Sequence, residues 1–364
     1  MMITIAYFIF LFTIVQFLIA TVNVIFKPKL PKRYNPYKGL VSVLIPARNE
    51  EENIGIILND LLQQDYKNIE IIVFNDQSSD QTAEIVEKFA TLDARIKLIH
   101  SEGLPAIWLG KNYACYSLSK IAKGEYFLFL DADVRLSNDI IINSISYAQR
   151  YQLGLLSIFP KQIITSPGEK ITVPNMNYIL LSLLPLILVR KSKFHALAAA
   201  NGQFMLFNAV VYRSLPPHEK MKDNKVEDIA IARFLKKEKH RIACLVGDET
   251  IRCRMYTGFK DAVNGFSKNV TAFFGDSLIL SLLFWLTTTF GFLIELFFLP
   301  VNFFVFYIIV YLFTRIFISW VSEQKVLDNI LYFFPQQLAC GLFIYKALIN
   351  KYNKNYQWKG RSIA

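Results

Sequence analysis

The hydrophobic pattern divides the chain into apolar ends and a mixed middle. Residues 1–26 carry no charged side chain, and residues 277–349 contain further long apolar runs. Between them, residues 40–270 alternate short apolar runs with mixed segments. Because about 20 apolar residues span a bilayer as a helix, the pattern predicts membrane segments at both ends and a water-soluble domain between them.

The N-terminal run, residues 1–26, favours a retained transmembrane anchor. A cleaved signal peptide would need a basic start and a small-residue cleavage site, and this run shows neither. The positions that follow are basic at Lys27, Lys29, Lys32, Arg33 and Lys38. By the positive-inside rule this flank lies in the cytoplasm, so we expect the N-terminus to point out of the cell.

The C-terminal region predicts two membrane spans and a third, shorter segment. Ser277–Trp320 has only Glu295 and Arg315 as charges, and Leu299-Pro300 is the expected turn between the spans. Ile330–Tyr345 is interrupted by Pro335, so it is expected either to span or to lie in the interface.

Two further segments bear on the membrane topology. Residues 350–364 form a basic tail without acidic residues, which is expected on the cytoplasmic side and favours an interfacial third segment. Pro174–Val189 is uncharged but interrupted by Pro185, so we expect an interfacial or core helix there.

The middle region predicts strands alternating with helices. Four continuous apolar runs are typical of buried strands: Val41–Ile45, Ile69–Phe74, Ile96–Ile99 and Tyr126–Leu130. Helices are expected after Asn49, which would be the N-cap with Glu52 as its capping-box partner, near Thr82–Phe89 and near Asn112–Lys120. Continuous rather than alternating apolar strands require helices on both faces of the sheet. The fold class is therefore α/β with a largely parallel sheet.

Polar loops follow three of these strands. They are Arg48–Glu51, Asn75–Asp80 and Asp131-Ala132-Asp133. In such sheets ligands bind at the carboxyl ends of the strands, so we expect the three loops to share one cleft. Carboxylates such as Asp131 and Asp133 suit Mg²⁺ or Mn²⁺, and Mg²⁺ in proteins is held by one or two carboxylates together with substrate phosphates. An Asx-turn that merely ends the strand is the alternative.

Composition and charge agree with a membrane setting. Hydrophobic residues make up 53% of the chain and the net charge is +11. The basic residues flank the apolar runs, which favours an anionic lipid surface over nucleic acid, for which no motif is present. The four cysteines form no Cys-x-x-Cys pair, so neither a zinc site nor a disulfide framework is expected.

Several stretches resemble a known family when taken in order. IPARNEEENIGIIL, FNDQSSDQT, FLDADV and VEDIAIARFLKKE look like the successive motifs of family 2 glycosyltransferases. The resemblance covers about residues 40–270 and implies a GT-A fold, a Rossmann-like domain with a mostly parallel sheet. PARNEE, WLGKNYAC, RMYTGFKDAVNGFSKN and QWKGR are similar to the bacterial carotenoid- and hopanoid-associated branch.

The resemblance also implies roles for matching residues. Pro46, Ala47 and Glu50 would line the pocket for the nucleotide base and ribose. The other implied roles are uracil pairing by Asp76, nucleotide binding by Lys111 and Asp131, metal binding by Asp133, and general-base catalysis by Asp228. Asn201-Gly202-Gln203 would shape the acceptor pocket or form a plain turn, and Trp108 would stack on a sugar or fill the core.

The implied reaction is inverting, metal-dependent transfer of one sugar to a membrane lipid. The donor would be a nucleotide sugar, UDP-glucose or similar, and the acceptor a carotenoid or other isoprenoid lipid. The processive synthases of the family carry a Gln-x-x-Arg-Trp motif that is missing here, which favours single transfer. The protein is expected to be a multi-pass protein of the cell membrane with its catalytic domain facing the cytoplasm.

Two other functions stay open on the sequence. One is a nucleotidyl- or phosphotransferase acting on a lipid, and the Glu227-Asp228 motif favours sugar transfer over it. The other is a non-catalytic membrane protein that binds sugar nucleotides. An enzyme is favoured over that alternative by four intact aspartates, namely Asp76, Asp131, Asp133 and Asp228.

Overall fold

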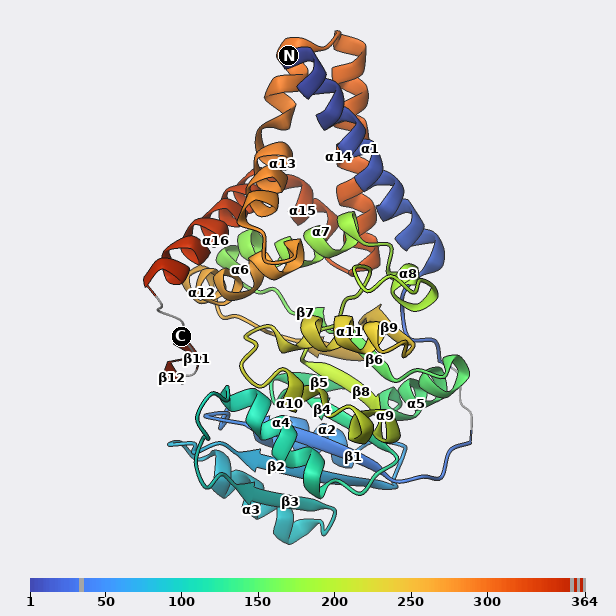
Figure 1. Ribbon diagram of the computed structural model, residues 1–364, viewed down its shortest axis with the longest axis vertical. Coiled ribbons are helices and arrows are strands. Elements are labelled where there is room, and N and C mark those ends of the chain that lie inside the picture. The colour runs from blue at the N-terminus through green and yellow to red at the C-terminus, as the bar shows by residue number, and fades with distance from the viewer. Residues whose placement is uncertain (33–35, 354–356, 359–360, 363–364) are drawn as a thin grey trace.

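A computed structural model describes residues 1–32, 36–353, 357–358 and 361–362. Apolar helices form a tapering stalk at one end of the long axis, and an α/β domain forms the other end (Figure 1). The N-terminus lies at the tip of the stalk. Arg33 of the expected basic flank and Lys354 and Lys359 of the expected basic tail lie outside the described residues.

A seven-stranded sheet forms the centre of the α/β domain. In spatial order its strands are β3 (Ile96–His100), β2 (Ile69–Asn75), β1 (Val41–Ala47), β4 (Tyr126–Leu130), β8 (Phe204–Asn208), β6 (Leu155–Phe159) and β9 (Ile242–Val246). Neighbours pair in parallel except β8, which runs antiparallel to both β4 and β6. The expected α/β class with a mostly parallel sheet is confirmed.

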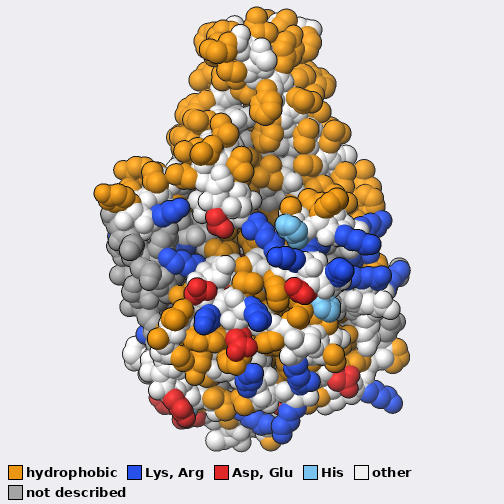
Figure 2. All heavy atoms as spheres, in the orientation of Figure 1, with side chains coloured by type: hydrophobic (Ala, Val, Ile, Leu, Met, Phe, Trp, Pro, Cys, Tyr) orange, Lys and Arg blue, Asp and Glu red, His pale blue; other side chains and the backbone are white. Residues whose placement is uncertain are grey.

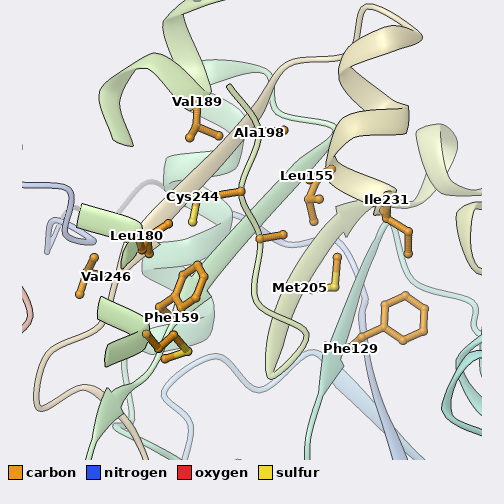
Figure 3. Packing of buried hydrophobic residues seen from close by; sticks show 14 of the residues in the cluster. Phe129, Leu155, Phe159, Leu180, Val189, Ala198, Met205, Ile231, Cys244 and Val246 are labelled. Carbon is orange, nitrogen blue, oxygen red and sulfur yellow. The ribbon is translucent and has the colours of Figure 1, made fainter. Parts of the chain in front are cut away.

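Helices cover both faces of this sheet, which is why its strands are apolar throughout. One face packs on α2 (Ile54–Leu62), α3 (Thr82–Leu92) and α5 (Ile140–Tyr151). The other packs on α4 (Gly110–Ile121), α7 (Pro174–Leu183), α8 (Leu186–Lys191) and α11 (Glu227–Lys237). Figure 3 shows this second core, with Phe129 and Met205 of the sheet near Ile231 of α11.

The expected helix start at Asn49 is wrong. Asn49 has a φ of 51°, and α2 begins only at Ile54, after Asn53, which makes no side-chain cap hydrogen bond. Instead the Oδ1 of Asn49 accepts a hydrogen bond from Ser79 N at 2.9 Å. The loops after β1 and β2 are bonded to each other, and this tertiary contact keeps residues 49–53 out of the helix.

Smaller elements complete the domain. They are a sheet of β5 (Val134–Leu136), β10 (Ile251–Cys253) and β7 (Lys161–Gln162), the helices α6 (Pro167–Thr172), α9 (Ala209–Ser214), α10 (Pro217–Lys220), α12 (Phe259–Asn269) and η1 (Val270–Phe274), and the pair β11 (Gln357–Trp358) and β12 (Arg361–Ser362). Because β5 follows Asp133 directly and pairs with β10, the small sheet brings Cys253 to the end of β4.

Three helices in the described part of the chain are long and apolar enough to cross a membrane. They are α1 (Met2–Phe26), α13 (Leu278–Phe298) and α14 (Val301–Val321). The last two meet at Leu299-Pro300, where the sequence predicts a turn. The third C-terminal run forms α15 (Val326–Leu331) and α16 (Phe333–Asn353), and α16 is not one of the three candidate spans. It packs against α12 and α13 at the base of the stalk (Figure 1).

The run Pro174–Val189 forms two helices with a break at Pro185. All residues of α7 up to Ser182 are buried, against the sheet on one side and against α1 and α14 on the other. It is therefore a core helix that joins the stalk to the domain.

Candidate active site

The carboxyl ends of β1, β2 and β4 lie side by side and gather the expected polar loops. Ala47 and Asn75 are paired in the sheet, and Asp76 N donates to Ala47 O at 2.8 Å. Because β8 is antiparallel, its start also reaches this edge, where Leu130 pairs with Phe204. Asp131 N donates to Gln203 O at 3.2 Å. The turn Asn201-Gly202-Gln203 thus joins the strand-end cluster.

Lys111 connects the strand end to α11. Its Nζ donates to Asp131 Oδ2 at 2.7 Å and lies 3.7 Å from Glu227 Oε1. Burial alone would lower the pKa of Lys111, but the two carboxylates outweigh it and raise that pKa. Burial raises the pKa of Glu227 to about 7, even though Lys111 acts in the opposite direction. A fixed positive charge therefore lies between two acidic groups from different elements.

Asp228 occupies the first turn of α11 and faces the same turn as Lys111. Its Oδ2 accepts a hydrogen bond from Gly202 N at 2.9 Å, and its Oδ1 accepts one from Ile229 N at 2.7 Å. Burial raises the pKa of Asp228 above its usual range, although both backbone donors oppose this. These two donors fix the carboxylate in position, and the raised pKa makes it a stronger base than an exposed aspartate.

Gly202 lies next to Lys111, Glu227 and Asp228. A Cβ on Gly202 would lie 3.1 Å from Lys111 Nζ, 3.2 Å from Glu227 Oε1 and 3.7 Å from Asp228 Cβ. A larger residue here would displace Lys111 or Glu227. The glycine therefore permits the close packing of the charged cluster, which is more than a plain turn requires.

Asp133 lies just before β5, among groups suited to a hard cation. Burial raises the pKa of Asp133 to about 6, and the negative charges of Asp131 and Glu50 add to this effect. The Nε2 of Gln203 lies 3.4 Å from Asp133 Oδ2, while its buried Oε1 has no hydrogen-bond partner among the described residues. Crowded carboxylates and a spare amide oxygen are oxygen donors of the kind that Mg²⁺ and Mn²⁺ prefer, so the residues fit a divalent cation.

The protein alone does not supply a complete set of ligands. Within the described ranges, no group of three or more His, Cys, Asp or Glu side chains is placed to hold a metal ion. A cation at Asp131 and Asp133 would therefore need substrate oxygens as further ligands, as Mg²⁺ at phosphate sites usually does.

The remaining candidate residues line the neighbouring strand ends. Pro46 and Ala47 are the last residues of β1, and buried Asp76 follows β2 directly. Glu50 N donates to Thr82 Oγ1 at 2.7 Å, which ties the loop after β1 to the start of α3. These four residues share the sheet edge with Asp131, whereas Lys111 and Asp228 reach it from helices.

Cys253 has no local sequence signal for a role at this site, and Gln203 was expected only to shape the acceptor pocket or to form a plain turn. Cys253 Sγ lies 3.3 Å from Asp133 Oδ2 and 2.8 Å from Gln203 Nε2, so both residues contact the proposed metal ligand. They are distant from Asp133 in sequence, and only the pairing of β5 with β10 and of β4 with β8 brings them near. Trp108 packs against the rings of Tyr113 and Tyr116 at 5.6 and 5.0 Å.

Two cavities border α11 on the side of the stalk. A cavity of about 140 Å³ is mostly apolar and is lined by Leu180 and Leu183 of α7 together with Ile229. A larger one, of about 680 Å³, also includes Ile229 and lies between α11, η1 and α16. Ile229 follows Asp228 directly in α11, and it lines both cavities.

Comparison with known proteins gives one family match and several relatives. Residues 42–214 match the family model described as Glycosyl transferase family 2. A 4,4'-diaponeurosporenoate glycosyltransferase of Staphylococcus haemolyticus (strain JCSC1435) is 28% identical over 248 residues, covering 66% of this chain and 63% of the relative. The protein of the same name from Staphylococcus aureus (strain USA300) is 26% identical over 236 residues, covering 64% and 60%. The match thus spans less than two thirds of either relative.

A solved structure shares the fold. The mannosyltransferase PcManGT from Pyrobaculum calidifontis, in complex with GDP-Man and Mn²⁺, superposes with a TM-score of 0.56 and 15% identity. The superposition covers 96% of this chain and all of that one (100%). At this identity the likeness concerns the fold, and it confirms the expected GT-A architecture.

Proposed function

We propose that this protein, a family 2 glycosyltransferase with its family domain at residues 42–214, transfers one sugar from a nucleotide sugar to a membrane lipid. The resemblance to the carotenoid-associated branch is confirmed by its relatives. The observation that carries the proposal is the hydrogen bond from Gly202 N to Asp228 Oδ2 at 2.9 Å, because Gly202 O also accepts from Lys111 Nζ at 3.5 Å. This contact brings Asp228, the proposed base, next to Lys111, the cation that binds Asp131.

The donor side of the site would be the edge formed by β1, β2 and β4. Pro46, Ala47, Glu50 and Asp76 would contact the base and ribose, and a carboxylate at Asp76 can accept the imide N–H of uracil. Lys111 would bind the diphosphate near Asp131. A divalent cation held by Asp133 and Asp131 would neutralise charge on the leaving diphosphate.

Asp228 would act on the acceptor. An acceptor hydroxyl must lose its proton as it attacks the anomeric carbon, and a positioned base contributes about 10²–10⁴-fold to such a step. The proton would pass to Asp228 Oδ1 or Oδ2, which Gly202 and Ile229 hold in place. One displacement inverts the configuration of the sugar. A carboxylic acid acceptor is already ionised near pH 7, and Asp228 would then orient it.

The acceptor would enter from the membrane side. The two cavities next to Ile229 are bounded by α7 and by η1 and α16, which also contact the apolar helices. An apolar lipid body could lie along α7 while its head reaches Asp228. With the basic residues after α1 on the cytoplasmic side, the catalytic domain would face the cytosol, where nucleotide sugars are available.

A transfer assay tests the proposal. Detergent-purified protein is incubated with radiolabelled UDP-glucose, Mn²⁺ or Mg²⁺, and a lipid extract that includes carotenoid acids. We expect label in the lipid phase and release of UDP, and neither with Asp228→Asn when the acceptor is an alcohol. Pyrophosphate release instead would indicate a nucleotidyltransferase, and binding of sugar nucleotides without any product would indicate a non-catalytic protein.

A further inference from the structure

A basic cavity of about 900 Å³ lies outside the candidate active site, between α8 and the end of α11. Seven of its lining residues are Lys or Arg, namely Arg190, Lys191, Lys193, Lys236, Lys237, Lys239 and Arg241. His195 and His240 also line it, and its described lining contains no Asp or Glu. Segments that are far apart in sequence therefore combine into one strongly positive pocket.

Lys236 is the buried cation of this pocket. Its side chain is 6% exposed, and its Nζ donates to the backbone oxygens of Leu197 at 2.5 Å and Phe194 at 3.2 Å. Among the described residues, no carboxylate forms an ion pair with Lys236, and burial lowers its pKa to about 8. A buried ammonium group that is bonded only to carbonyl oxygens keeps an uncompensated charge, which favours an anion nearby.

The end of α1 contacts α8, whose last residues line the cavity. Asn23, in the last turn of α1, donates to Leu181 O and Leu184 O at 3.0 Å and accepts from Leu186 N at 2.8 Å. These bonds fix α8 against the end of α1. Lys191 Nζ lies 5.6 Å from the ring centre of Phe26, the last residue of α1. Figure 2 shows Lys and Arg side chains gathered between the apolar stalk and the domain, where lipid headgroups would lie.

We propose that this cavity binds the phosphate of an anionic phospholipid headgroup beside the end of α1. A free phosphate ion would meet the same cations, but it would make no use of the half-exposed ring of Phe26, which lies next to Lys191 of the cavity. The cavity shares only His195 and Lys237 with the 680 Å³ cavity near Asp228, so a lipid bound here would leave the candidate acceptor path open. The site would fix the height of the domain relative to the membrane surface.

Matched triple variants test the site. Lys193→Gln, Lys239→Gln and Arg241→Gln remove three exposed charges at the cavity, and Lys67→Gln, Lys88→Gln and Lys97→Gln remove three exposed charges around β2, α3 and β3. Detergent-purified full-length proteins are titrated with short-chain phosphatidylglycerol, short-chain phosphatidylcholine or inorganic phosphate. The midpoint of thermal unfolding is followed, because a ligand that binds the folded state raises it.

We expect phosphatidylglycerol to raise the unfolding midpoint of the wild type and of the distant triple variant at the same concentration. The cavity triple variant should need at least about tenfold more lipid for the same shift, and phosphatidylcholine should give no shift. If the triple variant does not fold, Arg241→Gln alone replaces it, because this change removes only a long contact to Gln152 Oε1 at 3.4 Å. The single variant should need about fivefold more phosphatidylglycerol than the wild type for the same shift.

Three results would overturn the proposal. Equal loss in both triple variants would mean that overall charge matters and the cavity does not. An equal shift with inorganic phosphate at the same concentration would indicate a soluble-anion site. An equal shift with phosphatidylcholine would mean that the lipid binds through its apolar part alone.

Discussion

Gly202→Ala tests whether the charged cluster at the strand ends is the active site. The added Cβ would lie 3.1 Å from Lys111 Nζ and 3.2 Å from Glu227 Oε1. These distances are a few tenths of an ångström shorter than ordinary contacts, so Lys111 or Glu227 must move. No positive φ is recorded at Gly202, so alanine meets a steric obstacle from side chains only and no backbone strain.

The expected loss can be estimated from this displacement. A misplacement of about 1 Å at a catalytic group can cost about a hundredfold in rate, so a shift of about half that distance corresponds to about tenfold. This is about 1.4 kcal/mol of transition-state stabilisation. Because Lys111 has a long, flexible side chain, the fold should absorb the change, and the unfolding midpoint should move by less than about 3 °C.

Transfer of labelled sugar to lipid, measured at several donor concentrations, provides the assay. Gly55→Ala is the matched control, because its Cβ would meet Ile85 and Phe89 at 3.4 and 3.7 Å, which are ordinary contacts. That variant should keep full activity. Full activity in Gly202→Ala as well would refute the reasoning, since the cluster around Lys111 would then tolerate displacement. Equal losses in both variants would assign the effect to the fold.

Three further predictions concern the same domain. Lys111→Gln should lower kcat/KM about a hundredfold. The Lys111 charge opposes the burial that raises the pKa of Asp228, so with an alcohol acceptor this variant should also move the acid limb of the pH–rate profile to higher pH. An unmoved limb would contradict a base role for Asp228. Asp133→Asn should abolish both Mn²⁺-dependent transfer and Mn²⁺ binding measured by paramagnetic resonance, and chelation followed by Mn²⁺ should restore only the wild type. Burial lowers the pKa of His218 to about 3, so below about pH 6.5 the unfolded chain binds a proton that the folded chain does not. As the pH falls from about 6.5 to about 3, the free energy of unfolding should therefore decrease by about 1.4 kcal/mol per pH unit. His218→Phe should lack this slope in denaturant titrations at several pH values.

The elements whose burial is encoded locally were predictable. The run Tyr126–Leu130 is a strand at the predicted residues, and α13 and α14 meet at Leu299-Pro300 as expected. Five consecutive apolar residues before two carboxylates indicate a strand that is buried on both faces and ends at a polar edge. A long apolar run broken by proline likewise indicates two helices. Such patterns depend on neighbouring residues only.

Contacts between distant segments could not be predicted in this way, because they depend on how those segments pack in the tertiary structure. Asn49 looked like a helix cap, but its bond to Ser79 depends on β1 lying beside β2. Gly202 meets Lys111 and Asp228 because β8 runs antiparallel between β4 and β6, and no local pattern encodes that order.

The basic cavity likewise has one part that is encoded locally and another part that depends on tertiary contacts. The number of cations and the position of some of them beside the apolar runs can be read directly from the amino-acid sequence. Arg190 and Arg241 line one pocket because α8 packs against β9 and because α1 is bonded to the turn before α8. Burial preferences are properties of single segments, whereas the shape and charge of a site arise where segments meet.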